Sequence, residues 1–265
     1  MIETILALLA GLLIGSFLNV CIYRLPRLTN RSVVRPRSRC WRCRAPIAWY
    51  DNIPLLSYAL LGGRCRQCRR RIPIRYPIVE LATAVFFAVV VAYLGVTLPA
   101  LKFGLLCAIF IALTATDFER HILPDEFTLG GLAAGLILAF FIPNEGYLIS
   151  MLLPYSLGPR VLSFSEALFG AAVASGALWL IGYLYGKLRG VDALGFGDVK
   201  MIAMVGAFLG LRGALETMIL GSLAGSIIGL IYIRVARKDW RSFYIPFGSF
   251  LGIAGLVIVV FRIRQ

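Results

Sequence analysis

The chain has 265 residues, of which 60% are hydrophobic and only 15% are charged, and its mean hydropathy is +0.85. These values exclude a soluble globular protein and indicate a polytopic membrane protein. The formal net charge of +14 would also suit a nucleic-acid-binding protein. Most basic residues, however, fall in loops on one predicted side of a membrane, so we expect the lipid bilayer as a partner and no nucleic acid.

Apolar runs predict eight transmembrane helices, so the expected fold is an all-α polytopic membrane protein. The runs cover about 2–23, 77–98, 100–116, 126–142, 165–186, 199–211, 213–233 and 245–261. The first run lacks a basic n-region and a small-residue cleavage site, which predicts a retained helix at 1–23 instead of a signal peptide. The run at 199–211 is short for a bilayer about 30 Å thick, which suits a tilted or partly re-entrant segment.

The basic residues predict the orientation of these helices. With the N-terminus outside, the cytoplasmic loops are 24–76, 117–125, 187–200 and 234–244, and they hold 22 of the 27 Lys and Arg residues. This distribution follows the positive-inside rule. It places Asp117 and Asp198 at the same, cytoplasmic face of the membrane.

These two aspartates are the candidate catalytic residues. Asp117 follows an apolar run, and Asp198 ends the sequence Gly195-Phe196-Gly197-Asp198 just before another. Carboxylates at membrane spans are costly and mark functional sites. A pair that shares one proton can activate a water molecule and polarise a carbonyl group, and the two glycines allow a close backbone approach. The residues point to an intramembrane aspartyl protease that needs no cofactor for the peptidase step.

Each of these acidic residues also has a structural interpretation. Asp117 could be a charge that caps a helix end, and Asp198 could be the N-cap of the helix that follows it. Asp125, which follows Pro124, suits a turn or cap, or a supporting role in the site. The single histidine, His121, lies in a predicted loop, which disfavours Ser-His and Cys-His mechanisms.

The segment 24–76, called here the cysteine loop, contains two C-x-x-C pairs. They are Cys40 with Cys43 and Cys65 with Cys68, and 21 residues separate the pairs. This spacing is typical of a four-thiolate zinc site in a zinc-ribbon-like loop. Two disulfides are the alternative, which a reducing cytoplasm disfavours. Four thiolates leave no ligand position for water, so the zinc would be structural. The predicted domains are therefore a first transmembrane helix (1–23), the cysteine loop (24–76) and a transmembrane peptidase domain (77–265).

Segments along nearly the whole chain resemble, in the same order, the type IV prepilin peptidases of the leader peptidase/N-methyltransferase group. Besides the two cysteine pairs, the matching segments are 15–20, 23–26, 52–57, 75–77 with Glu80, 116–117, 123–125, 195–200 and 245–248. One departure is Asp192, which stands where the family often has a glutamate.

This resemblance implies an inner-membrane aspartyl protease that removes leader peptides from type IV prepilins and pseudopilins after a glycine, at the cytoplasmic face. Asp117 and Asp198 fall on the catalytic aspartates, with Gly195, Gly197, Asp125 and Lys200 as supporting residues. It also implies methylation of the new N-terminus by S-adenosylmethionine, an activity that accompanies the four-cysteine loop in the family. Glu80 is a candidate residue for this cofactor.

Two other functions stay open from the residues alone. An ion- or proton-coupled membrane transporter would also use intramembrane carboxylates, although it would place them near the bilayer midplane. A non-enzymatic membrane scaffold would use the cysteine loop to bind a partner, and it would not depend on either aspartate.

Overall fold

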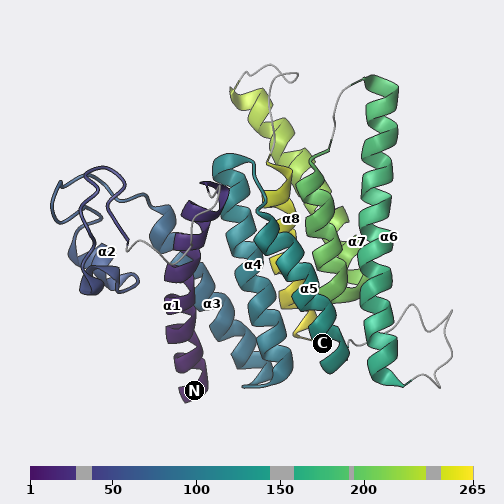
Figure 1. Ribbon diagram of the computed structural model, residues 1–265, viewed down its shortest axis with the longest axis horizontal. Coiled ribbons are helices and arrows are strands. Elements are labelled where there is room, and N and C mark those ends of the chain that lie inside the picture. Colours follow the sequence, from purple (N-terminus) through teal and green to yellow (C-terminus); the bar gives the residue numbers. More distant parts are fainter. Residues whose placement is uncertain (28–37, 144–157, 191–193, 237–245, 265) are drawn as a thin grey trace. The chain divides into compact units, whose positions relative to one another are not determined.

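The computed structural model describes residues 1–27, 38–143, 158–190, 194–236 and 246–264. Regular structure within these residues is helical apart from two isolated β-bridges in the cysteine loop (Figure 1). The apolar helices are α1 (Ile2–Arg24), α3 (Arg75–Leu94), α4 (Leu98–Arg120), α5 (Asp125–Phe141), α6 (Pro159–Arg189), α7 (Phe196–Ala236) and α8 (Phe247–Arg262). The short helix α2 (Leu56–Leu60) and a 3-10 turn (Trp49–Asn52) belong to the cysteine loop.

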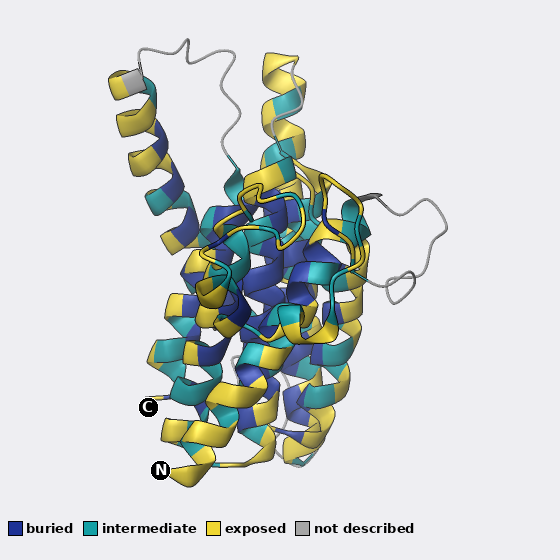
Figure 2. Ribbon diagram, turned by 90° about the vertical axis from the view of Figure 1, so that its left-hand side faces the viewer, coloured by how far each residue is buried: buried dark blue, intermediate teal, exposed yellow. Residues whose placement is uncertain are grey.

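The expected all-α membrane architecture is confirmed. Among the described residues, five helices are long and apolar enough to cross a membrane, namely α1, α3, α4, α6 and α7, and α8 is a shorter apolar helix. Figure 2 shows exposed residues along the outward faces of the helices. These faces carry large apolar side chains such as Ile181 on α6 and Ile231 on α7. Apolar side chains on an outward face are what lipid requires.

Helix α4 extends further than the sequence predicts. The predicted run ends at residue 116, whereas α4 continues to Arg120, so Asp117 lies inside the last turns of a helix and not in a loop. The amide of His121 still donates to the carbonyl oxygen of Asp117 at 2.8 Å. His121 itself has a φ of 54°, and this left-handed conformation ends the helix.

Helix α7 consists of two parts that join at Gly210. This residue has φ 71° and ψ −178°, which no helix accommodates, and the chain changes direction there (Figure 1). A straight helix of 41 residues would measure roughly 60 Å, about twice the hydrocarbon thickness of a bilayer. The break therefore divides α7 into a first part, 196–209, which is short for a bilayer, and a longer second part, 211–236, and these parts correspond to the predicted runs 199–211 and 213–233.

A buried carboxylate on α6 stabilises this break. Glu166 is 2% exposed, and its Oε1 accepts a hydrogen bond of 3.2 Å from the amide of Leu211, the first residue after Gly210. Helices α6 and α7 pack backbone to backbone nearby, because a Cβ atom on Gly206 would lie only 2.5 Å from the amide nitrogen of Ala171. Glu166 thus supplies an acceptor for an amide that the broken helix leaves without one.

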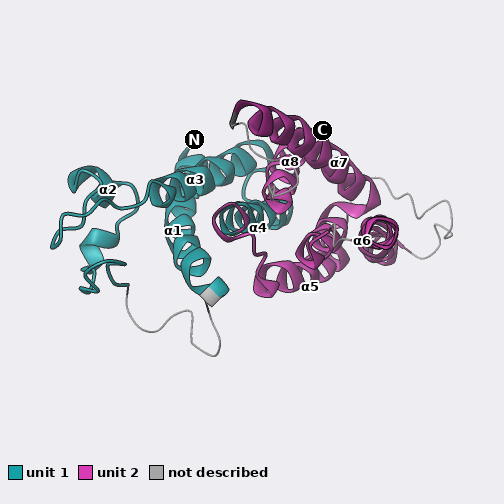
Figure 3. Cartoon of the chain, turned by 90° about the horizontal axis from the view of Figure 1, so that it is seen from above, with its two compact units in different colours: residues 1–116 teal, residues 117–265 magenta. Residues whose placement is uncertain are grey.

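The chain divides into two compact units, residues 1–116 and 117–265 (Figure 3). In the first unit, α1 packs against α3 through Gly11 and Gly15, where an added Cβ atom would lie 2.6 Å and 2.8 Å from backbone Cα atoms of α3. The Asn19 side chain donates to the carbonyl oxygen of Tyr76 at 3.0 Å. The predicted domains 1–23, 24–76 and 77–265 were defined by the role expected of each segment, whereas the two units are defined by compactness. The predicted domains therefore stay a prediction.

Replacing Glu166 by alanine will destabilise the protein, because the amide of Leu211 then loses its acceptor in a buried place. We expect a loss of about 1–3 kcal/mol, measured as a lower midpoint of thermal unfolding in detergent. The control is Ser175→Ala on the same helix, where the hydroxyl donates to carbonyl oxygens of its own helix, those of Ala171 and Ala172. We expect that change to stay within about 0.5 kcal/mol, and equal effects of the two variants would contradict the role of Glu166.

Candidate functional site

Asp198 lies in the first turn of α7 and is therefore not its N-cap. The helix begins at Phe196, and the amide of Asp198 donates to the carbonyl oxygen of Gly195 at 3.0 Å. The carboxylate turns back over this glycine, since a Cβ atom on Gly195 would lie 3.1 Å from Oδ2 of Asp198. The side chain is buried.

Asp117, near the end of α4, accepts two hydrogen bonds from a single residue of α8. Its Oδ2 lies 2.6 Å from the backbone amide nitrogen of Ser249 and 2.8 Å from the Ser249 hydroxyl. Ser249 is the third residue of α8, and its amide is shared between Asp117 and the Pro246 carbonyl oxygen, which lies 3.2 Å away. Asp117 therefore caps a helix, but that helix is α8 and not its own.

The structure brings both aspartates to this first turn of α8. A Cβ atom on Gly248 would lie 3.1 Å from Oδ1 of Asp198. The next residue, Ser249, is the one that donates to Asp117. The two carboxylates thus lie against consecutive residues of α8, Asp198 against Gly248 and Asp117 against Ser249. Both are buried, at 6% and 9% exposure. Two buried carboxylates that lie close together titrate as a unit and can act as an acid and a base.

Three glycines surround Asp198 and are needed for space. An added Cβ atom on Gly195 or on Gly248 would lie 3.1 Å from a carboxylate oxygen of Asp198, and one on Gly197 would lie 3.1 Å from the Leu123 side chain. A Cβ atom on Gly248 would also lie 3.0 Å from the Leu123 side chain. The predicted supporting glycines 195 and 197 thus lie at the carboxylate pair, and Gly248 joins them.

Asp125 and Lys200 pair with each other beside this site. Lys200 Nζ lies 2.7 Å and 2.9 Å from the two carboxylate oxygens of Asp125, the first residue of α5. Lys200 also lies 5.3 Å from the centre of the Phe196 ring. The Asp125 side chain is 57% exposed, so the pair orients the starts of α5 and α7 more than it stabilises them.

The four loop cysteines form a cluster that could hold a metal ion. The sulfur atoms of Cys40, Cys43, Cys65 and Cys68 all lie within 4.8 Å of one another, and those of Cys40 and Cys68 are 3.8 Å apart. Four thiolates around a tetrahedral zinc with Zn–S bonds of about 2.3 Å would be about 3.8 Å apart. All six cysteines of the chain are free thiols.

The two C-x-x-C pairs have the same local structure. The amide of each first cysteine donates to the carbonyl oxygen five residues later, Cys40 to Ala45 and Cys65 to Arg70, both at 2.9 Å. The residue after each second cysteine, Arg44 or Arg69, has a φ of 59° or 55°. The backbone amides of Cys68 and Gln67 donate to the Cys65 sulfur and lower the pKa of this thiol to about 7. A thiolate at neutral pH is the form that binds a metal.

Glu80 on α3 connects the cysteine loop to the helices. Its Oε2 accepts a hydrogen bond of 2.9 Å from the amide of Leu55, and the Ser16 side chain also bonds to it. Leu55 has φ 57° and ψ −46° and is the centre of a γ-turn closed from the Leu56 amide to the Pro54 carbonyl oxygen. This type of γ-turn is strained. The hydrogen bond to the buried Glu80 carboxylate stabilises the strained conformation of Leu55 and so fixes the loop at this point.

Sequence reasoning missed two residues that the structure makes important, Ser249 and Glu166. Glu166 is a charge within an apolar run, so the criterion that identified Asp117 could have found it. Ser249 directly follows the segment 245–248, but one hydroxyl in an apolar run carries no signal of its own. Asp192 lies outside the described residues.

Comparisons with known proteins match almost the whole chain. Residues 9–94 match the family model of the bacterial peptidase A24 N-terminal domain, and residues 104–232 match that of the type IV leader peptidase family. The prepilin leader peptidase/N-methyltransferase of Pseudomonas putida is 34% identical over 96% of this chain and 89% of the relative. The enzyme of the same name from Pseudomonas aeruginosa is 35% identical over 96% of this chain and 88% of the relative. The one from Aeromonas hydrophila is 34% identical over 96% of this chain and 89% of the relative. No solved structure matches the chain.

A methyl group at Gly248 will disturb the site, because it would press on Leu123 and on the Asp198 carboxylate. We expect Gly248→Ala to destabilise the protein by about 1–3 kcal/mol, as overpacking does, measured by thermal unfolding in detergent. Gly130→Ala on α5 is the matched control, because a Cβ atom there meets nothing within 4 Å. A Gly248→Ala variant as stable as the control would show that the site has more room than described.

Proposed function

The chain belongs to the type IV leader peptidase family, the prepilin leader peptidase/N-methyltransferases, and we propose that it processes prepilins. It cleaves the leader peptide of type IV prepilins or pseudopilins after a glycine, at the cytoplasmic face of the bacterial inner membrane. It then methylates the new N-terminus with S-adenosylmethionine. The observation that carries the proposal is the convergence of Asp117 and Asp198 on the first turn of α8. The proposal assigns the cysteine loop (24–76) to methylation and 77–265 to cleavage.

The carboxylate pair suits hydrolysis of a peptide bond. One carboxylate takes a proton from water while the water oxygen forms a bond to the scissile carbonyl carbon, and the other gives its proton to the carbonyl oxygen. The C–N bond then breaks as the amide nitrogen takes up a proton. Because the two groups titrate as a unit, the proposal assigns the proton to the pair and not to one aspartate.

The surroundings of the pair support this role. Ser249 fixes the Asp117 carboxylate with two hydrogen bonds, so its position is set before a substrate arrives. Asp198 is flanked by Gly195 and Gly248. Glycine backbone without side chains lets a substrate strand approach closely. A transporter or a scaffold would use only one of the two centres, either the carboxylate pair or the four thiols.

We propose zinc as the metal of the four-cysteine cluster. Four thiolates and the tetrahedral sulfur spacing suit zinc better than hard cations, which prefer oxygen ligands. With all four positions filled by Cys40, Cys43, Cys65 and Cys68, the metal would fold the loop and take no part in cleavage.

Asp117→Asn and Asp198→Asn will each lower the rate of leader cleavage about a hundredfold or more, because each removes one proton-transfer group of the pair. The measurement is mass spectrometry of a prepilin N-terminus after incubation with the purified variant. Glu216→Gln is the control, since Glu216 pairs with Arg212 and Arg262 away from the site. Cleavage at the wild-type rate by either aspartate variant would refute the mechanism.

Cys65→Ser will reduce bound zinc from about one atom per chain to none, because three thiolates and a hydroxyl hold zinc poorly. The loop should then become sensitive to proteases, since its fold depends on the metal. Zinc is measured by elemental analysis and the loop by limited proteolysis. Cys21→Ala, a buried cysteine of α1 outside the cluster, should keep its zinc. Full zinc content in Cys65→Ser would exclude this metal site.

A further inference from the structure

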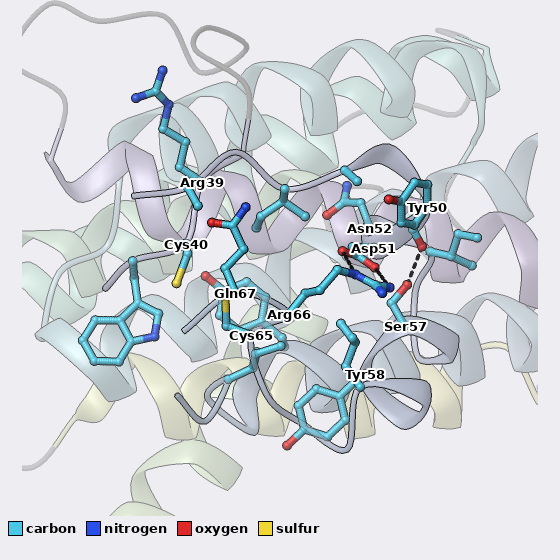
Figure 4. Close-up of a pocket in the computed structure, with 18 of the residues that line it drawn as sticks. Arg39, Cys40, Tyr50, Asp51, Asn52, Ser57, Tyr58, Cys65, Arg66 and Gln67 are labelled. Carbon is cyan, nitrogen blue, oxygen red and sulfur yellow. Dashed lines mark hydrogen bonds and ion pairs between the residues drawn. The ribbon is translucent and has the colours of Figure 1, made fainter. Parts of the chain in front are cut away.

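The first unit contains a cavity that neither cleavage nor the metal accounts for. Its volume is about 250 Å³, and it lies between the cysteine cluster and α3, with Cys40 and Cys65 on one side and Glu80 on another. Figure 4 shows the labelled polar and aromatic side chains around it. A concave site with aromatic walls and a few polar groups is the usual form of a small-molecule site.

Four aromatic residues contribute to the lining, and the Tyr50 ring is held in place by a cation. The rings belong to Trp41, Tyr50, Tyr58 and Tyr76. The Arg66 guanidinium lies 5.5 Å from the centre of the Tyr50 ring and donates to both oxygens of Asp51, at 2.6 Å and 2.8 Å (Figure 4). Arg66 also keeps the pKa of Asp51 below its usual value, through its hydrogen bonds and its charge. This wall is therefore ordered without a ligand, as a site for a planar ring requires.

The lining presents charges of both signs. Arg39, Arg66 and Arg70 contribute cations, and Asp51 and Glu80 contribute carboxylates. Asp51 is matched by Arg66, whereas no cation pairs with Glu80 among the residues that the structure describes. A simple anion would gain nothing from Glu80, and a simple cation would be repelled by the arginines. The lining suits a ligand that combines a cation, a carboxylate and a planar base.

We propose that this cavity binds S-adenosylmethionine, with Glu80 facing the positive part of the methyl donor. This inference rests on the methyltransferase part of the proposed function. The adenine suits the aromatic walls, the sulfonium and amino groups suit Glu80 and the ring faces, and the ligand carboxylate suits the arginines. When bound, the donor supplies a methyl group: the bond from the substrate nitrogen to carbon forms as the C–S bond breaks, its electron pair stays on sulfur, and the amine loses a proton.

The test is direct binding to the full, zinc-loaded chain in detergent. Equilibrium dialysis with labelled S-adenosylmethionine measures affinity, and tryptophan fluorescence during titration with S-adenosylhomocysteine reports contact with Trp41. Glu80→Gln keeps an oxygen for the Leu55 amide but removes the charge, so we expect binding about tenfold weaker or more. Tyr50→Leu removes one ring and keeps the backbone oxygen that accepts from Ser57, so we expect weaker binding here too.

The control variants use the two neighbouring tryptophans. Trp41→Phe should abolish the fluorescence change, whereas Trp49→Phe, which is outside the cavity lining, should keep both the change and the wild-type affinity. Wild-type affinity in both Glu80→Gln and Tyr50→Leu overturns the site. Zinc content is measured in each variant, and weaker binding with full zinc content supports the site.

Leader cleavage by the same preparations separates the failures of the two proposals. If the wild-type chain cleaves a prepilin but binds no S-adenosylmethionine, the inference is overturned and the peptidase assignment stands. If the chain binds the donor in this cavity but cleaves no prepilin, the inference is supported and the peptidase assignment fails.

Discussion

The bond between Asp117 and Ser249 is the interaction on which the candidate active site depends. A carboxylate buried in an apolar protein is costly unless donors compensate it. Ser249 provides two such donors, its amide and its hydroxyl, from the first turn of α8. The same contact places Gly248 against Asp198. One helix start therefore both stabilises the first carboxylate and positions the backbone beside the second.

Three buried carboxylates of this chain have one structural task in common. Asp117 accepts from the amide of Ser249, Glu166 from that of Leu211 and Glu80 from that of Leu55. Each amide lies where helical hydrogen bonding is interrupted, at a helix start, after a helix break or in a γ-turn, although the Ser249 amide also bonds to the Pro246 carbonyl oxygen. Without nearby water, such an amide needs an acceptor from a side chain. Acidic side chains are thus buried at the irregular points of the fold. Two of them, Asp117 and Glu80, are also candidate functional residues, so the need to satisfy a buried amide and the candidate chemistry coincide at the same side chains.

The sequence predicts this fold well where a pattern repeats and poorly where a single contact decides. Apolar runs locate the helices, including both parts of α7, and the cysteine spacing predicts the thiol cluster that the structure contains. The extra turn of α4 to Arg120 has no such signal, because the polar residues from Asp117 onward resemble a loop in sequence. The contact between Asp117 and Ser249 joins residues that are 132 positions apart, and only the folded chain brings them together.

The anchoring of the cysteine loop on Glu80 has a consequence for where methylation can occur. Glu80 is five residues after the start of α3 at Arg75, which is roughly 7 Å along the helix axis. If α3 enters the bilayer near Arg75, as the predicted topology has it, a cavity whose wall includes Glu80 lies at the depth of the lipid headgroups. In the proposed function, a prepilin that keeps its apolar helix in the bilayer would present its new amine at this same depth. Enzyme and substrate then search for each other in two dimensions, within the plane of the membrane, and the substrate never has to be extracted from it.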